Sequence, residues 1–244
     1  MRWEQGVAMS LLELARVSKR YGRGSAERVT LRDVSLQLEA GEFVAVWGRR
    51  RSGRSTLLRI AAGLEAPDEG VVSFDGHDLA DPRSEALRSG IRYCRKSFRP
   101  AGGQLVLDQL TTSQLTRGVS LSLARERAGR ALVRVGAARC AAVRPSELDS
   151  EEITRVVIAR ALVHGPKMIV IDEPTLGVEI AARDGILSLL RALADDGIAV
   201  LASATETAGL AGADRALSLA KGSLRGELDA PELAPVVPLR SASA

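Results

Sequence analysis

Residues 42–58 read EFVAVWGRRRSGRSTLL. The apolar run at residues 42–47 is typical of a short buried strand, and the pattern from Ser55 onward is helical. Gly48 and Gly53 stand between the two with the spacing G-x-x-x-x-G, followed by a basic residue and a hydroxyl residue. Glycines at these positions let the backbone turn so that its N–H groups converge on a phosphate at the positive end of the helix. The stretch therefore predicts a phosphate-binding loop between a strand and a helix.

The basic residue of this loop departs from the usual pattern. Arg54 stands where the pattern has lysine, and its planar guanidinium keeps the positive charge but is larger than an ammonium. Ser55 offers its hydroxyl to Mg²⁺. The structural alternative is a glycine turn within a solvated run of arginines, but the flanking strand and helix favour the phosphate loop. The residues expected to bind nucleotide phosphates are Gly48, Arg49, Arg50, Arg51, Ser52, Gly53, Arg54, Ser55 and Thr56.

A pair of acidic residues follows a second apolar run further along the chain. Residues 168–171 read MIVI, as in strands that are buried on both faces of a sheet, and Asp172 and Glu173 come directly after them. Ligands of α/β proteins bind at the carboxyl ends of such strands. We therefore expect Asp172 to hold Mg²⁺, through water, and Glu173 to orient or deprotonate the attacking water.

The composition of the 244-residue chain excludes several classes of protein. With 45% apolar residues it can bury a core, and no apolar run reaches the roughly 18 residues of a membrane span. The first residues do not show the charged-then-apolar pattern of an export signal, and Cys94 and Cys140 are too few for a disulfide framework. We therefore expect a cytosolic protein with reduced thiols. A net charge of +4 fits phosphate or nucleic acid, but aromatic residues are only 3%, which disfavours a stacking platform for single strands.

Strand-like and helical segments alternate along the chain. Strands are predicted at residues 29–38, 42–47, 71–74, 91–94, 168–171 and 198–202. Helices are predicted at residues 55–62 and 181–194, with a mostly helical stretch over 105–162. This alternation predicts an α/β fold with a mainly parallel sheet.

The motifs together resemble the nucleotide-binding subunit of an ABC transporter, in the branch for lipoprotein release, macrolide export and cell division. Besides the two motifs above, the matching text is VSKRYG at 17–22, LRDVSL at 31–36, AAGLE at 61–65, residues 155–162 and DR at 214–215. The resemblance covers residues 11–227 and implies ATP and Mg²⁺ as cofactors. In this family Tyr21 would stack on adenine.

The resemblance also implies the ABC ATPase fold. This is an α/β fold with a RecA-like P-loop NTPase core, an antiparallel β edge subdomain and an inserted helical subdomain. The cassette is expected over residues 9–228, with the core at 9–95 and 160–228 and the helical subdomain at 96–159. Residues 1–8 are expected to be an N-terminal extension and residues 229–244 a flexible tail.

Three positions depart from the family at the nucleotide. Arg54 replaces the P-loop lysine. Lys96 stands at the Q-loop glutamine, which contacts Mg²⁺ and the attacking water in the family, and a lysine cannot ligate a cation. Thr205 stands at the switch histidine, where it can donate a hydrogen bond but cannot change its charge near neutral pH. His77 and His164 lie in other parts of the sequence, and neither replaces that histidine.

The fourth departure lies in the signature, where the family has LSGGQ or LSGGE. The residues at these positions are Leu148, Asp149, Ser150, Glu151 and Glu152. In the family the serine and glycines contact the γ-phosphate bound by the opposite subunit, and a carboxylate ~4 Å from it costs about 4 kcal/mol at an effective dielectric of ~20. A structural role is favoured over a catalytic one: Asp149 and Glu152 form a capping box that begins a helix at 151–163. The D-loop, LGVE at 176–179, departs as well.

These departures bear on the partners. ABC ATPases form head-to-tail dimers, and each site combines the P-loop of one subunit with the signature of the other. Both halves are altered here, so the resemblance favours a degenerate subunit that binds ATP and Mg²⁺ weakly or not at all. It would pair with an intact ATPase, as a heterodimer rather than a homodimer, on an integral membrane permease at the cytoplasmic face of the cell membrane. The branch favours export, extraction or force transmission over import.

Two alternatives remain. In the first, the chain is a catalytically competent ABC ATPase for which Arg54 and Glu173 suffice. In the second, less favoured, it is a soluble ABC protein that acts on nucleic acid. The chain is too short for the two tandem domains of one such type, and it lacks the sustained heptads of the coiled-coil types. No nucleic-acid partner is therefore expected.

Overall fold

The computed structural model describes residues 10–22, 28–95 and 103–227. Its central sheet consists of Phe43–Trp47 (β3), Ile91–Cys94 (β6), Met168–Ile171 (β7), Ala199–Ala204 (β8), Arg215–Ala220 (β9) and Ser223–Glu227 (β10). The order across this sheet is β10-β9-β3-β8-β7-β6. Neighbouring strands run parallel except β10, which pairs antiparallel with β9. The mainly parallel sheet expected from the sequence is confirmed.

The strands at the centre of this sheet are buried on both faces. In β3, Val44 and Val46 pack into one hydrophobic core, and Phe43 and Ala45 pack into the other. Each of these four side chains is 0% exposed. Since successive side chains of a strand point to opposite faces, a continuous apolar sequence supplies both cores at once. The sheet is therefore the middle layer of the molecule.

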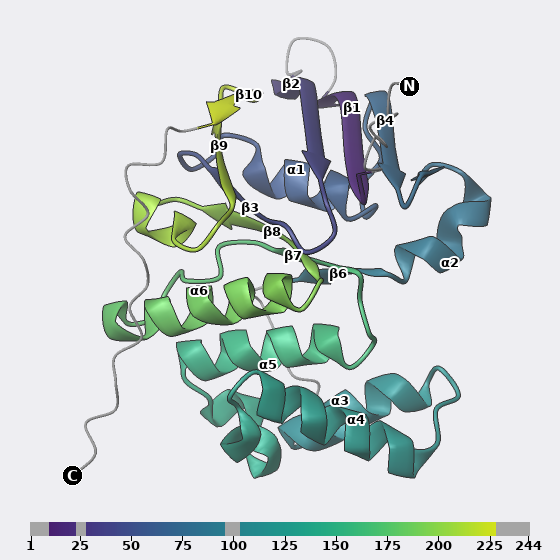
Figure 1. The fold of residues 1–244 in the computed structure, drawn as a ribbon, viewed down its shortest axis with the longest axis vertical. Coiled ribbons are helices and arrows are strands. Elements are labelled where there is room, and N and C mark those ends of the chain that lie inside the picture. The colour runs from purple at the N-terminus through teal and green to yellow at the C-terminus, as the bar shows by residue number, and fades with distance from the viewer. Residues whose placement is uncertain (1–9, 23–27, 96–102, 228–244) are drawn as a thin grey trace, which may run out of the picture.

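A second, antiparallel sheet covers one side of the first. Its strands are Leu12–Tyr21 (β1), Arg28–Leu38 (β2), Glu69–Phe74 (β4) and His77–Asp78 (β5), in the order β2-β1-β4-β5. Helix α1, Arg54–Ala61, lies between the two sheets (Figure 1). Its Leu57, Leu58 and Ile60 are at most 1% exposed and belong to the core that both sheets share. The antiparallel β edge subdomain implied by the family resemblance is present.

Helices cover the opposite face of the central sheet. Figure 1 shows α6, Ile180–Asp195, and α5, Ser150–Leu162, next to the sheet, with α3, Val106–Leu115, and α4, Leu121–Arg134, beyond them. The shorter helices are α2 (Glu85–Arg88) and the 3₁₀ turns η2 (Pro82–Ser84), η3 (Ala138–Ala142), η4 (Pro145–Glu147) and η5 (Thr207–Leu210). The mostly helical stretch predicted over 105–162 is confirmed.

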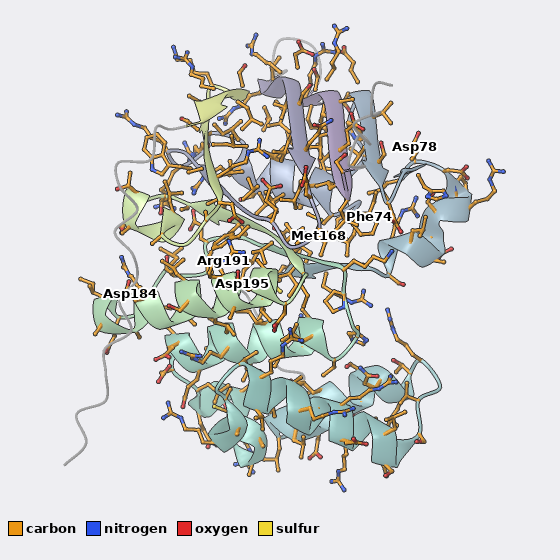
Figure 2. The ribbon with its side chains drawn as sticks, in the orientation of Figure 1. Phe74, Asp78, Met168, Asp184, Arg191 and Asp195 are labelled. Atoms are coloured by element: carbon orange, nitrogen blue, oxygen red, sulfur yellow. The ribbon has the colours of Figure 1, made fainter. Side chains whose placement is uncertain are left out.

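One arginine of α6 fixes the start of the central strand. Figure 2 shows Arg191 and Asp195 on this helix. Arg191 donates from Nε to Asp195 at 2.9 Å and from Nη1 to Asp214 at 2.7 Å. Asp214 also accepts the N–H of Phe43 at 2.8 Å. This network positions β3, and therefore the loop that follows it.

The segment boundaries differ from the sequence prediction by one or two residues. α1 begins at Arg54, and α5 runs one residue earlier at each end than the predicted helix over 151–163. The strands β1, β9 and β10 were not predicted as separate elements, because their apolar alternation is interrupted by basic and hydroxyl residues. The boundary expected between residues 159 and 160 falls within α5, and the expected extension at 1–8 and tail at 229–244 lie outside the described residues.

Both cysteines are buried and free. Burial raises the pKa of Cys94 to about 12, so its thiol stays protonated near neutral pH. Within the described residues, every helix is too short or too polar to traverse a bilayer.

Candidate functional site

Two glycines close the turn from β3 into α1. Gly53 has a φ of 107°, and a Cβ there would lie 2.7 Å from the carbonyl oxygen of Thr30. A Cβ on Gly48 would lie 2.6 Å from the carbonyl oxygen of Leu219. Both positions therefore require glycine. The N–H of Gly48 donates to the carbonyl of Ala204 at 3.2 Å, which joins the loop to the end of β8.

Arg54, the first residue of α1, is paired with one of the predicted catalytic residues. Its Nη2 donates to Oε1 of Glu173 at 2.7 Å. The Arg54 side chain is 6% exposed and that of Glu173 is 21% exposed, so the ion pair is largely buried. Nη1 of Arg54 is also buried, and no described residue accepts a hydrogen bond from it. The guanidinium thus holds one anion and keeps a second donor group uncompensated.

The two acidic residues after β7 are held by one serine. Ser203 of β8, which is 1% exposed, donates its hydroxyl to Asp172 at 2.5 Å and accepts the N–H of Glu173 at 3.0 Å. Glu173 has a φ of 49°, a left-handed conformation that is uncommon outside glycine. Ser203 was missed by sequence analysis. A hydroxyl residue near the carboxyl end of an apolar parallel strand is the signal that points to it.

A cleft of about 530 Å³ lies in front of this pair. It is lined by Arg50, Arg51, Arg54, Ser55, Arg59, Tyr93, Arg95, Asp172 and Glu173. Five guanidinium groups face two carboxylates, so the cleft is strongly cationic and suits a polyanion. Burial, and after it the Asp172 carboxylate, raises the pKa of Tyr93 to about 12, so its hydroxyl stays a neutral donor.

The remaining residues of the predicted loop support this cleft in different ways. Gly48 and Gly53 shape the turn, and Arg49 is exposed beside it. The hydroxyl of Ser52 is buried, and no described group accepts or donates a hydrogen bond there. Thr56 is 6% exposed and points back towards β1. The structure therefore brings the P-loop positions and the acidic pair together, as the sequence predicts.

Tyr21 lies at the end of β1 and is 39% exposed. Its hydroxyl lies 3.4 Å from Thr56 Oγ1, accepts from Arg59 at 3.1 Å and donates to Glu65. Nζ of Lys19 lies 5.8 Å from the ring centroid. The hydroxyl of Tyr21 is held by these hydrogen bonds, and the residue is partly exposed to solvent. Its ring can therefore stack on a planar group next to α1.

The signature positions begin α5. The N–H of Glu152 donates to Asp149 at 2.8 Å, and the N–H of Asp149 donates to Glu152 at 3.1 Å, which is the predicted capping box. Glu151 pairs with Arg155 at 2.7 Å. Ser150 shares a small cavity with Asp172 and Glu173, whereas the other signature positions line neither that cavity nor the arginine-rich cleft in the described structure. Leu148 is 8% exposed and packs in the core.

The positions of the switch histidine and the Q-loop glutamine are not found in the described part of the cleft. Thr205 directly follows β8, half-buried, and is not among the described residues that line the cleft. Lys96 lies outside the described residues. In the D-loop, Leu176 is 48% exposed, and Ile180 at the start of α6 is 80% exposed.

Comparisons with known proteins identify the family of this chain. The family model described as ABC transporter matches residues 31–176. The lipoprotein-releasing system ATP-binding protein LolD of Roseobacter denitrificans is 35% identical over 220 residues, which cover 88% of this chain and 97% of LolD. This chain belongs to the ABC transporter family. The macrolide export ATP-binding/permease protein MacB of Syntrophobacter fumaroxidans is 32% identical over 79% of this ABC chain, which spans only 28% of that larger relative.

Solved structures show the same fold. The ATP-binding cassette MJ0796, solved as a dimer and in a post-hydrolysis state bound to ADP and Pi, superposes with a TM-score of 0.80. The identity is 27%, over 90% of this ABC chain and 98% of MJ0796. The chain is therefore an ABC ATPase cassette, as the sequence resemblance implies.

The donor set of the cleft fits the phosphates of a nucleotide and a magnesium ion. The glycine turn leaves room for phosphate oxygens, and Nη1 of Arg54 and Oγ of Ser52 are buried polar atoms without a described partner. Ser55 and Asp172 both line the cleft and offer the oxygen ligands that Mg²⁺ prefers. The described residues hold no group of three metal-ligating side chains, so other ligands would come from phosphate and water.

Proposed function

We propose that this cassette binds ATP and Mg²⁺ in the Arg54 cleft and works as a degenerate half of a membrane transport complex, with little or no ATP hydrolysis of its own. The observation that carries the proposal is the buried ion pair between Arg54 and Glu173. Glu173 is the residue that would orient or deprotonate the attacking water. Here it is the counter-ion of the residue that would bind phosphate.

Phosphate binding becomes an exchange of anions at Arg54. Removing one partner of a buried ion pair leaves an uncompensated charge and costs about 3–5 kcal/mol. A phosphate oxygen that replaces the Glu173 carboxylate keeps the guanidinium compensated, and the exposed Arg50 and Arg51 add attraction from the rim. Binding is then possible, but weaker than binding to a cation without a competing carboxylate.

Hydrolysis requires further groups that this cassette lacks. Glu173 can act on water only after Arg54 has turned to the phosphates. Lys96 offers no metal ligand, Thr205 replaces an imidazole, and Asp149 carries a negative charge where an opposing phosphate would approach. If each change costs about 1.4–3 kcal/mol of transition-state stabilisation, the rate falls roughly 10³-fold or more, although such effects need not add.

The proposed partners are a permease and a second, intact ATPase. MacB is an ATP-binding/permease protein, which supports a permease as the partner of this cassette at the cytoplasmic face of the membrane. A heterodimer is favoured because a homodimer would set the altered signature, with Asp149 and Glu151, against both nucleotides. The capping box further supports this pairing, because Asp149 is engaged in beginning α5.

The test is a comparison of ATP turnover by the lone cassette and by its native membrane complex, each with and without Glu173→Gln. We expect negligible turnover by the lone cassette and turnover in the complex that is indifferent to Glu173→Gln. A matched change of the corresponding glutamate in the partner ATPase should abolish the activity of the complex. Robust turnover by the lone cassette that is lost in Glu173→Gln would overturn the proposal.

A catalytically competent ATPase is the second candidate, and one observation favours it. Ser203 holds Asp172 and Glu173 in fixed positions beside Ser55, so the acidic pair is already organised for chemistry. If the cassette is a competent ATPase, Arg54 replaces the P-loop lysine without loss of ATP turnover. This candidate predicts that Arg54→Lys leaves turnover unchanged, whereas the degenerate reading predicts an increase, since a lysine ammonium forms no guanidinium fork with Glu173.

A further inference from the structure

A second cationic cavity lies between the central sheet and the helical layer. Its volume is about 280 Å³. It is lined by Arg92, Tyr93 and Cys94 of β6, Ser113 of α3, Arg117 after α3, Val157, Arg160 and Ala161 of α5, and His164 after α5. We call Arg92, Arg117, Arg160 and His164 the basic pocket. It shares only Tyr93 with the arginine-rich cleft at Arg54.

Arg92 has a free edge in this cavity. Its Nε and Nη2 are both buried, and no described group accepts a hydrogen bond from either. These two nitrogens lie on the same edge of the guanidinium, where their N–H groups point in parallel and match the two oxygens of a carboxylate or phosphate. Buried donors in folded proteins nearly always have an acceptor. The edge therefore indicates a ligand oxyanion.

The described residues that line the cavity also include no aspartate or glutamate, and neither Arg92 nor Arg117 pairs with a described carboxylate. Burial and the charge of Arg117 lower the pKa of Arg92. Burial, and then Arg92, Arg117 and Arg160, lower the pKa of His164 to about 4. Arg92, Arg117 and Arg160 line the same cavity and can therefore act together on one anion.

We propose that the basic pocket binds one small free oxyanion, with a phosphate or carboxylate group seated on the Nε–Nη2 edge of Arg92 and compensated by Arg117 and Arg160. A bound anion would connect β6, the end of α3 and α5, because these elements each supply a cation. It would also reverse the effect on His164, since a nearby negative charge favours the imidazolium. Among the described residues, this site shares only Tyr93 with the Arg54 cleft, and anion binding there does not require ATP.

The test uses the two histidines of the full chain as reporters. His164 lies in the basic pocket, whereas His77 lies on β5 with its Nδ1 2.7 Å from the Asp75 carbonyl oxygen. Histidine ¹⁵N resonances are followed during titrations with potassium phosphate, potassium acetate and potassium chloride at equal ionic strength. We expect phosphate to shift His164 with saturation and to raise its pKa by ~1 unit or more, with His77 following the chloride titration.

Variants then locate the binding. Arg92→Gln should remove the saturable response of His164, and Arg117→Gln, which changes an exposed side chain, should weaken it if Arg92→Gln does not fold. Arg125→Gln on α4, where Arg125 pairs with Asp108 at 3.6 Å, is the matched control and should leave the response intact. Phosphate held at Arg54 would be unaffected by Arg92→Gln, so it cannot produce this pattern.

The titrations distinguish a general oxyanion site, a phosphate-specific site and the absence of a site. Saturation with phosphate and acetate supports a general oxyanion pocket, and saturation with phosphate alone supports the same pocket restricted to phosphate groups. A response to phosphate no larger than the response to chloride would overturn the proposal. So would a saturable response that persists unchanged in Arg92→Gln.

Discussion

Arg54 has two competing partners. In this structure its guanidinium is the counter-ion of Glu173, and in the proposed function a nucleotide phosphate competes with Glu173 for it. Lysine at this position would present a compact ammonium without a planar fork. One side chain thus couples the binding of phosphate to the release of the carboxylate.

Arg54→Ala should lower the affinity for a fluorescent ATP analogue about tenfold or more. The reason is that Glu173 would remain beside the phosphates without its counter-ion and would repel them. Adding Glu173→Gln to that variant should recover part of the affinity. Arg130→Ala, which changes an exposed arginine of α4 outside the cleft, is the control and should change little. Equal affinities for wild type and Arg54→Ala would show that Arg54 has no part in binding.

Ser203→Ala should lower the free energy of unfolding by about 1–3 kcal/mol. The change removes the hydroxyl that bonds both Asp172 and Glu173, and it leaves the partly buried N–H of Glu173 without an acceptor. Ser218→Ala in β9, at a serine that is 8% exposed and bonds neither carboxylate, is a matched control with a smaller expected effect. The measurement is urea denaturation, and identical midpoints for the two variants would contradict the role of Ser203.

At the start of α5, the residues that cap the helix occupy positions of the family signature. Asp149 and Glu152 cap each other's backbone N–H groups, and acidic residues in the first turn suit the positive end of a helix. The same carboxylate is unfavourable next to an opposing phosphate. Helix stability and phosphate contact therefore place opposite demands on this position.

Asp149→Ala should cost about 1 kcal/mol of stability, whereas Asp149→Ser should cost only a few tenths, because serine caps almost as well as aspartate. Thermal or urea unfolding of the two variants measures the difference. In the membrane complex, Asp149→Ser should also raise ATP turnover, since it removes a negative charge without removing the cap. A loss of stability as large in Asp149→Ser as in Asp149→Ala would contradict the capping role.

The molecule as a whole should be less stable in mild acid because of His164. Its pKa is near 6.5 when unfolded and about 4 when folded, so between these values the unfolded chain binds more protons. His164 leaves the free energy of unfolding unchanged above pH ~6.5. As the pH falls towards 4, proton uptake by the unfolded chain lowers this free energy by about 1–3 kcal/mol after solvent screening is allowed for. His164→Gln should flatten this part of the stability profile, and His77→Gln should not. Parallel profiles for wild type and His164→Gln would contradict the assignment.

Local patterns account for what the sequence could predict. The glycine spacing, the apolar run before Asp172 and the capping box at Asp149 each depend on a few neighbouring residues, and each is found where expected. The Arg54–Glu173 pair joins residues 119 positions apart, so it depends on how β3 and β7 are placed in the sheet.

Two further features follow from packing rather than from spacing. Ser203 becomes a partner of the acidic pair only because β8 lies next to β7. The sequence places His164 in a loop, and only the meeting of β6 with α3 and α5 gives it three arginine neighbours. Contacts between residues on different strands and helices therefore cannot be predicted from local sequence patterns alone.

The burial of α1 between two sheets has a consequence for amide hydrogen exchange. Leu57, Leu58 and Ile60 are buried between the two sheets, so the amide protons of these three residues should exchange with deuterium only when the whole cassette unfolds. Arg49, Arg50 and Arg51 lie in the exposed turn just before it and should exchange early. Deuterium uptake in that turn would thus report a bound nucleotide, whereas uptake at Leu57, Leu58 and Ile60 should stay constant and serve as an internal standard within a single peptide map.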